Sequence, residues 1–168
     1  MSFFVKDFIS QLENLDSVKL NRLRDLVLNA KGTIIILGNG GSNALASHIA
    51  EDYTKALKKN AISFSDAARL TCYANDYGYE NAFRQFLSEF SDKDSLVILI
   101  SSSGNSENIL NCAKYCIKNN VKFITLSGFN KNNKLKKLSK KAELDFWVNS
   151  ENYGIVELTH ETILHSFC

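Results

Sequence analysis

Two short stretches of the chain carry the residue types from which anion-binding turns are built. Residues 33–37 form a β-branched, apolar run, and Gly-Asn-Gly-Gly-Ser-Asn follows it directly. Residues 95–100 form a second such run, followed by Ser-Ser-Ser-Gly-Asn-Ser-Glu-Asn. Glycines let the backbone approach an anion, while free N–H groups, hydroxyls and the helix dipole attract it. Serine-rich loops are also common helix caps, so one loop alone would be weak evidence. The two together favour a phosphate or sugar-phosphate ligand.

Neither loop matches the commonest nucleotide-binding motifs. A Walker motif requires Gly-Lys-Ser/Thr, which neither loop contains. The first loop lacks the last glycine of the dinucleotide fingerprint, and no acidic residue ends the next expected strand. The loops therefore indicate a phosphate or sugar-phosphate ligand without either of these two nucleotide-binding motifs.

A second group of residues could bind a metal or transfer protons. His48 and Asp52 lie four residues apart on the helix that the first loop opens, so they share a face. Two further histidines, His160 and His165, lie in the last expected helix, where Glu157 precedes His165 by eight residues. Eight residues turn a helix by about 80° more than two full turns, so the side chains of Glu157 and His165 can both lean toward one site. Such a set could hold a divalent ion, most naturally zinc, although each pair alone is more often a surface ion pair or a cap.

These residues require elements that bring distant parts of the chain together. Buried apolar runs alternate with amphipathic stretches at βαβ lengths, which predicts a three-layer α/β/α sandwich with a mostly parallel sheet. In such a sheet, ligands bind outside the carboxyl ends of the strands. We expect strands near residues 33–37, 60–65, 95–101, 122–128 and 144–150, and helices within 3–29, 43–57, 67–90 (with a break near 75–80), 106–120, 133–142 and 156–167.

Length and composition agree with one domain over residues 1–168. A formal charge of +2 is too small to indicate a nucleic-acid or membrane partner, and the basic run at 131–141 reads as a solvated helix face. No apolar stretch approaches the roughly 18 residues of a membrane span, and the N-terminal residues do not resemble a signal peptide. The four cysteines lack a zinc-knuckle spacing and are expected to be reduced. We therefore expect a cytoplasmic protein.

Four motifs together resemble a known family. Gly-Asn-Gly-Gly-Ser-Asn with the helix after it, Tyr-Ala-Asn-Asp-Tyr-Gly-Tyr-Glu-Asn-Ala-Phe, Ile-Ser-Ser-Ser-Gly-Asn-Ser-Glu-Asn-Ile and Ile-Thr-Leu-Ser-Gly follow one another as in the sugar isomerase (SIS) domain. The closer resemblance, from Gly32 to His165, is to the phosphoheptose isomerases. It implies a flavodoxin- or Rossmann-like fold and a homotetramer with active sites at subunit interfaces, in which residues 1–30 contribute contacts. The implied reaction interconverts D-sedoheptulose 7-phosphate and D-glycero-D-manno-heptose 7-phosphate, feeding lipopolysaccharide or capsule synthesis.

The resemblance also assigns residues. It implies one Zn²⁺ per subunit on His48, Asp52, Glu157 and His165. The implied substrate-binding residues are Asn39, Gly40, Gly41, Ser42, Asp52, Asn75, Asp76, Ser101, Ser102, Ser103, Ser106 and Glu157. This chain departs from the family at two of these positions: Asp52 stands where Glu is usual, and Glu157 where Gln is usual. It also ends three residues after His165, where the family's last helix runs on.

The reaction implied by the resemblance proceeds through an enediol(ate). A base must take a proton from the carbon beside the carbonyl, and an acid must return one at the neighbouring carbon. By position, Asp52 and His165 inherit these roles, with Glu157 as the alternative base because Asp52 is one methylene shorter than Glu. Two other functions remain open: a non-catalytic SIS-domain protein that binds sugar phosphates or a replication initiator, and an isomerase of another phosphorylated ketose–aldose pair.

Overall fold

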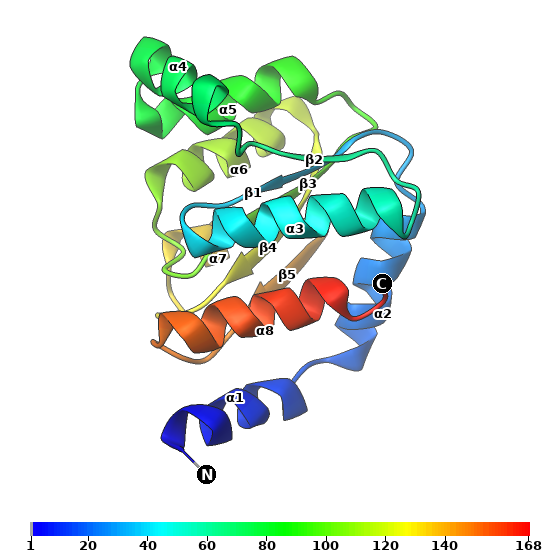
Figure 1. Cartoon of the computed structure of the whole chain (residues 1–168), viewed down its shortest axis with the longest axis vertical. Helices are drawn as coiled ribbons and strands as arrows, with labels where there is room; N and C mark the ends of the chain where they lie inside the picture. The colour runs from blue at the N-terminus through cyan, green and yellow to red at the C-terminus, as the bar shows by residue number, and fades with distance from the viewer. Residues whose placement is uncertain (1) are drawn as a thin grey trace.

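A parallel sheet of five strands forms the centre of the molecule, in the order β2-β1-β3-β4-β5 (Figure 1). The computed structural model describes residues 2–168. The strands are β1 (Ile34–Leu37), β2 (Ala61–Ser63), β3 (Leu96–Ser101), β4 (Lys122–Ser127) and β5 (Leu144–Trp147). All four pairings are parallel, as in β1–β3, where Ile36 pairs with Ile98. The predicted α/β fold with a parallel sheet is confirmed.

The helices form where the apolar periodicity predicts them, with ends that differ by a few residues. They are α1 (Phe3–Glu13), α2 (Ser17–Leu28), α3 (Gly41–Lys55), α4 (Ala67–Tyr77), α5 (Tyr79–Phe90), α6 (Glu107–Asn119), α7 (Lys134–Leu138), which continues as the 3₁₀ turn η1 (Ser139–Lys141), and α8 (Tyr153–His165). The predicted break in residues 67–90 falls at Gly78, whose φ of 76° interrupts the helix. None of the described helices is long and apolar enough to cross a membrane.

Alternate residues of the strands face two separate apolar clusters. On β1, Ile34 and Ile36 pack with α2, α3 and α8 on one face of the sheet. Ile35 and Leu37 pack with α5 and α6 on the other face. This period of two, with helices on both faces, makes the three layers. Helix α1 has no buried residue and lies beside α8, away from the sheet (Figure 1).

The strand order places the two predicted anion loops next to each other. From β1 the chain runs outward to β2 on one side, and β3 then pairs with β1 on its other side. The carboxyl ends of β1 and β3 are therefore neighbours at the point where the direction of winding reverses, which is where open α/β sheets bind ligands.

The cysteines are free thiols, as predicted. Cys112 and Cys116 are buried in the apolar cluster formed with α5 and α6. Burial raises the pKa of the Cys116 thiol to about 12, so it stays protonated and acts as a small core residue. Cys72 and Cys168 are exposed.

A buried histidine attaches α8 to the end of β4. His160 is fully buried, and its Nε2 lies 3.2 Å from the carbonyl oxygen of Ser127. A carbonyl can only accept, so Nε2 carries the ring proton. Burial lowers the pKa of His160 from 6.5 to about 4, so the ring is neutral in the folded chain.

This histidine should make folding depend on pH. An unfolded chain binds a proton at His160 below about pH 6.5, whereas the folded chain does so only below about pH 4. Stability is thus present above that window and lost as the pH falls through it, by about 3 kcal/mol in total. In urea unfolding, His160→Gln, which keeps an N–H donor, should flatten the wild-type pH dependence. The exposed His48→Gln variant is the control, with chelator in every sample so that no metal is bound. Equal slopes for wild type and His160→Gln would contradict the prediction.

Candidate active site

A hollow of about 280 Å³ opens where the β1–α3 and β3–α6 loops meet. Ten of its eleven lining residues are polar or glycine, and most of them were predicted to bind substrate. The lining consists of Asn39, Gly40, Gly41, Ser42, Ile100, Ser101, Ser102, Ser103, Ser106, Tyr153 and Glu157. A larger hollow of about 460 Å³ between α1, β5 and α8 contains none of the predicted site residues.

Two of the three helices that begin at the smaller hollow, α3 and α6, have no side-chain cap. Helix α3 begins after Gly40, and α6 begins after Ser106, whose hydroxyl accepts a bond from Ser101 at 3.2 Å and not from the backbone of α6. By contrast, side chains of Asp16, Asp66 and Asn152 cap α2, α4 and α8. The serine loop is therefore not explained by capping, and the first two N–H groups of α3 (Gly41 and Ser42) and of α6 (Glu107 and Asn108) are left for an anion.

Ser102 adds an unused hydroxyl to this hollow. Ser102 lines the hollow, and its Oγ is buried without a hydrogen-bond partner among the described residues. A buried hydroxyl without a partner costs roughly 1–3 kcal/mol. Rotation of the side chain toward an oxyanion in the hollow would give this hydroxyl a partner.

Glu157 lies against the beginning of α3. A Cβ atom at Gly41 would come within 2.6 Å of both carboxylate oxygens of Glu157. Only glycine allows this approach, and it brings a negative charge to the positive end of the α3 dipole. Glu157 is therefore part of the hollow, as predicted for a substrate-binding residue.

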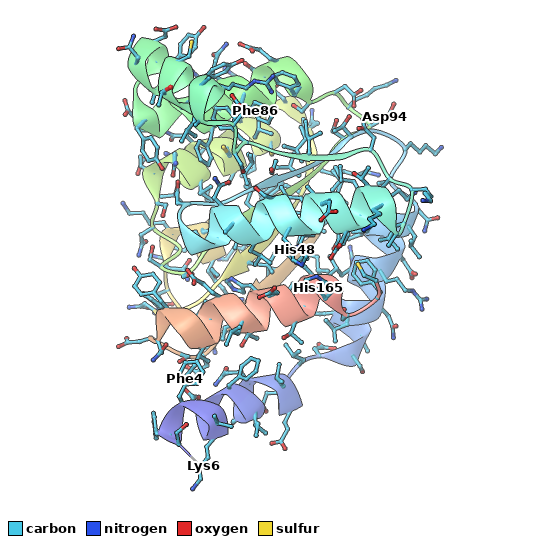
Figure 2. The ribbon with its side chains drawn as sticks, in the orientation of Figure 1. Phe4, Lys6, His48, Phe86, Asp94 and His165 are labelled. Carbon is cyan, nitrogen blue, oxygen red and sulfur yellow. The ribbon has the colours of Figure 1, made fainter. Side chains whose placement is uncertain are left out.

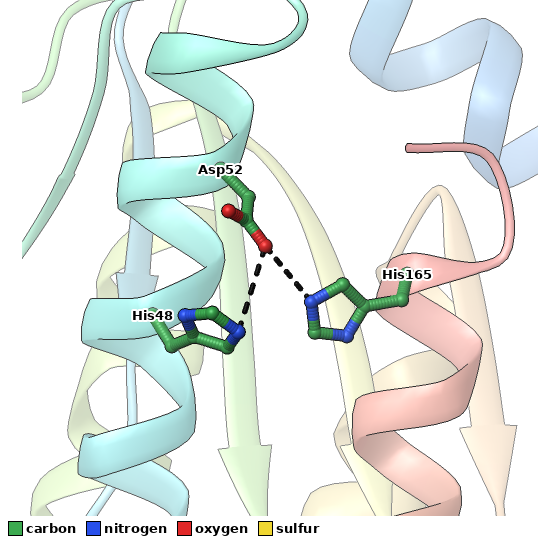
Figure 3. Close-up of side chains that lie close together, drawn as sticks. All are labelled: His48, Asp52 and His165. Carbon is green, nitrogen blue, oxygen red and sulfur yellow. Dashed lines mark hydrogen bonds and ion pairs between the residues drawn. The ribbon is translucent and has the colours of Figure 1, made fainter.

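Asp52 joins the two predicted histidines of α3 and α8 (Figure 3). Its Oδ2 lies 2.9 Å from Nε2 of His165 and 3.6 Å from Nε2 of His48. One ligand atom from each of the three residues lies within 4.8 Å of the others. Figure 2 shows both histidines between the two helices. The structure therefore brings together three of the four predicted metal ligands.

The ring orientation of His165 fits a metal ligand. Its Nδ1 lies 3.1 Å from the carbonyl oxygen of Glu161, so Nδ1 donates its proton there. In a neutral ring, Nε2 then directs a lone pair at the Asp52 carboxylate, and two acceptors 2.9 Å apart repel unless a proton or a cation lies between them. Metal-binding histidines commonly donate their second N–H to a carbonyl in this way.

Glu157 does not belong to this three-residue cluster among the described residues, contrary to the four-ligand prediction. The prediction considered the angle between Glu157 and His165 around the helix. It neglected the rise, which separates residues eight positions apart by about 12 Å along α8. Glu157 therefore reaches the start of α3, while His165 lies beside Asp52 more than two turns further along.

Asn75 and Asp76 do not line the hollow. They are exposed on α4, where the Asn75 amide donates to Asp76 at 2.9 Å. Sequence reasoning also missed two residues near the hollow, Tyr153 and Asn108. Tyr153 lies one turn before Glu157 on α8, a spacing that could have indicated a shared face. Asn108 is buried behind the serine loop and resembled an ordinary residue of a helix N-terminus.

Comparisons with known proteins identify the family and the fold of the chain. Residues 4–128 match the model of the SIS domain family. A phosphoheptose isomerase from Cytophaga hutchinsonii is 36% identical over 135 residues, covering 76% of this chain and 70% of that protein. One from Thermodesulfovibrio yellowstonii is 35% identical over 147 residues, covering 84% and 71%. The solved phosphoheptose isomerase of Neisseria gonorrhoeae has the same fold, with a TM-score of 0.86 at 23% identity over 97% of this chain and 90% of that one.

The contact between Gly41 and Glu157 can be tested by a double-mutant cycle. In Gly41→Ala the new Cβ meets the carboxylate, whereas in the Glu157→Ala background that carboxylate is gone. We expect the two changes to be coupled by about 0.5–3 kcal/mol in the free energy of unfolding, measured in urea. The control pairs Gly41→Ala with Glu161→Ala, one turn further along α8, and should be additive. Additivity of the Gly41–Glu157 pair would contradict the contact.

Proposed function

The chain belongs to the phosphoheptose isomerase family of SIS-domain proteins, and from this premise we propose that it interconverts D-sedoheptulose 7-phosphate and D-glycero-D-manno-heptose 7-phosphate. As a member of this family it is an aldose–ketose isomerase of sugar phosphates. We further propose one SIS domain over residues 1–168, a cytoplasmic location and a product that enters lipopolysaccharide or capsule synthesis.

The observation that carries the choice of sugar is the separation of the two parts of the site. The hollow lies at the start of α3 and α8, and the His48–Asp52–His165 cluster lies further along the same two helices. The seven residue-to-residue steps along α3 from Gly41 to His48 span about 10 Å. A seven-carbon sugar with its phosphate in the hollow has the length to bring its first two carbons to the cluster.

The cluster residues supply the proton transfers of this proposal. Asp52 takes a proton from the first carbon of the ketose, His165 returns one from Nε2 to the second carbon, and the hydroxyl proton on the first carbon passes to the oxygen of the second. Asp52 Oδ2 and His165 Nε2 lie 2.9 Å apart, so a sugar bound beside the pair would meet the base and the acid together. The charge of the enediolate between these steps requires stabilisation.

His48, Asp52 and His165 would hold one Zn²⁺ in the state in which Nε2 of His165 carries no proton. Three protein ligands leave a position open for substrate, as is usual for catalytic zinc. The ion would polarise the carbonyl and hydroxyl oxygens of the sugar. Glu157 then acts from the hollow, on the part of the sugar nearer the phosphate.

The protein is proposed to form a homotetramer with active sites at subunit interfaces. On α1, Phe3 is 85% exposed, and Val5 and Ile9 are also exposed, an apolar surface that suits a second copy. Asn75 and Asp76 are exposed outside the hollow, so their predicted role as substrate ligands is proposed for the assembled form.

Conversion by the purified protein tests the function directly. Proton NMR should show the aldose product from sedoheptulose 7-phosphate, with a kcat/KM at least about tenfold above that for five- and six-carbon ketose phosphates, equivalent to about 1.4 kcal/mol. Preference for a shorter sugar would identify an isomerase of another pair. Binding without conversion would identify a non-catalytic sugar-phosphate protein.

Charge-removing variants separate the two carboxylates. Asp52→Asn, assayed with saturating zinc, should lower kcat by roughly 10²–10⁴-fold because the base is lost. Glu157→Gln should remain active because its carboxylate lies in the hollow. If Glu157→Gln loses the activity and Asp52→Asn keeps it, the base has been assigned to the wrong residue.

Metal content provides an independent measurement. Protein purified without chelator should contain about one zinc per chain. His48→Ala and His165→Ala should remove it, because each deletes one of three ligands. Glu157→Ala and the matched His160→Gln should retain it. Loss of zinc in Glu157→Ala but not in His160→Gln would restore the four-ligand site.

A further inference from the structure

A pair of carboxamides joins the two loops of the hollow. Asn39 Nδ2 donates to Asn108 Oδ1 at 2.9 Å, and Asn108 Nδ2 donates back to Asn39 Oδ1 at 2.8 Å. Asn39 belongs to the loop after β1, and Asn108 is the second residue of α6. Only 3% of Asn108 is exposed, so water competes little for these bonds.

Two further donors complete the arrangement. The Tyr79 hydroxyl donates to Asn39 Oδ1 at 2.8 Å, and the backbone N–H of Ile109 donates to Asn108 Oδ1 at 3.0 Å. Each carboxamide oxygen therefore accepts two hydrogen bonds, which uses both of its lone pairs. The oxygen of Asn39 has no lone pair left for a ligand.

These bonds link three segments that are far apart in the sequence. Asn39 precedes Gly40 and Gly41 on one wall of the hollow, and Asn108 follows Ser106 on the opposite wall. Tyr79 is the first residue of α5, just after the Gly78 break that ends α4. The distance between the walls therefore depends on this network.

We propose that Asn39, Asn108 and Tyr79 are positioning residues that hold the glycine and serine loops at the separation that admits one phosphate group. One N–H of Asn39 Nδ2 bonds to Asn108, and the other stays available to a ligand in the hollow. The inference rests on the proposed function for the identity of the ligand. The backbone of the loop and the serine hydroxyls remain the groups that bind the phosphate.

Asn108→Asp gives a readout that a merely structural role would not produce. The ionised carboxylate cannot donate to Asn39, and it faces the Asn39 and Ser106 side of the hollow with a negative charge. Once protonated, the new carboxyl group can donate through its O–H and still accept from Asn39 Nδ2. We therefore expect the KM of the variant relative to wild type to be raised about tenfold at about pH 8, and to approach the wild-type value at about pH 5, because burial at position 108 raises the pKa of the new carboxyl group.

The effect should be confined to KM. Asp52 and His165 lie about two helical turns from the hollow, so kcat should change by less than about threefold. Asn111→Asp is the matched control: Asn111 lies on α6 and donates to the Glu80 carbonyl at 2.9 Å, which links α6 to α5 without touching either loop. Its KM should equal that of wild type at both pH values.

Tyr79→Phe keeps the test decisive if Asn108→Asp fails to fold. It removes one hydroxyl from an exposed ring and should raise KM severalfold, while Tyr77→Phe, at the end of α4 on the exposed surface, should not.

Dissociation constants for sedoheptulose 7-phosphate and inorganic phosphate, from titration calorimetry, should change by the same factors. An inactive wild-type protein would refute the proposed function, and these constants would still test the network. Wild-type affinity in both Asn108→Asp and Tyr79→Phe would overturn the inference.

Discussion

The parallel packing of α3 against α8 is the constraint on which both parts of the site depend. Apolar residues of the two helices share one cluster over the sheet, including Ile49, Tyr53 and Ile163. Within it, the Tyr53 hydroxyl donates to the Leu164 carbonyl at 3.0 Å. Burial raises the pKa of Tyr53, so its hydroxyl remains a donor. Because the helices run in the same direction, their first turns meet at the hollow and their later turns meet at the His–Asp cluster.

The strands and helices could be predicted because each apolar run has one face or two faces to bury. Continuous runs such as Ile34–Leu37 pack against both apolar clusters. The glycines on either side of such a run indicate where the strand ends and a loop begins. The site was predictable wherever one element supplies neighbouring residues, as with His48 and Asp52. The prediction failed at Glu157, because a rise of about 12 Å along a helix is not visible in a comparison of angles alone. That Glu157 lies against Gly41 depends on how two helices are aligned, which periodicity does not specify.

The role of Asn108 could not be predicted for a different reason. An asparagine near a helix N-terminus commonly bonds to nearby backbone groups, and Asn108 does accept from the N–H of Ile109. The same oxygen also accepts from Asn39, which is 69 positions away. The local sequence predicts the bond from Ile109 but not the bond from Asn39, because Asn39 reaches Asn108 only when β1 and β3 are neighbours in the sheet.

Two features of the hollow lower the stability of the ligand-free protein and favour the binding of an anion. Helices α3 and α6 begin without side-chain caps, and Ser102 keeps a hydroxyl that has no partner among the described residues. Caps are worth about 1 kcal/mol each, so their absence lowers stability at this point of the fold. The Glu157 carboxylate lies in the positive field of α3 that an oxyanion would also occupy. In the proposed complex, the phosphate lies between the glycine and serine loops on the side away from Glu157, and the rest of the sugar extends along α3 and α8 toward Asp52.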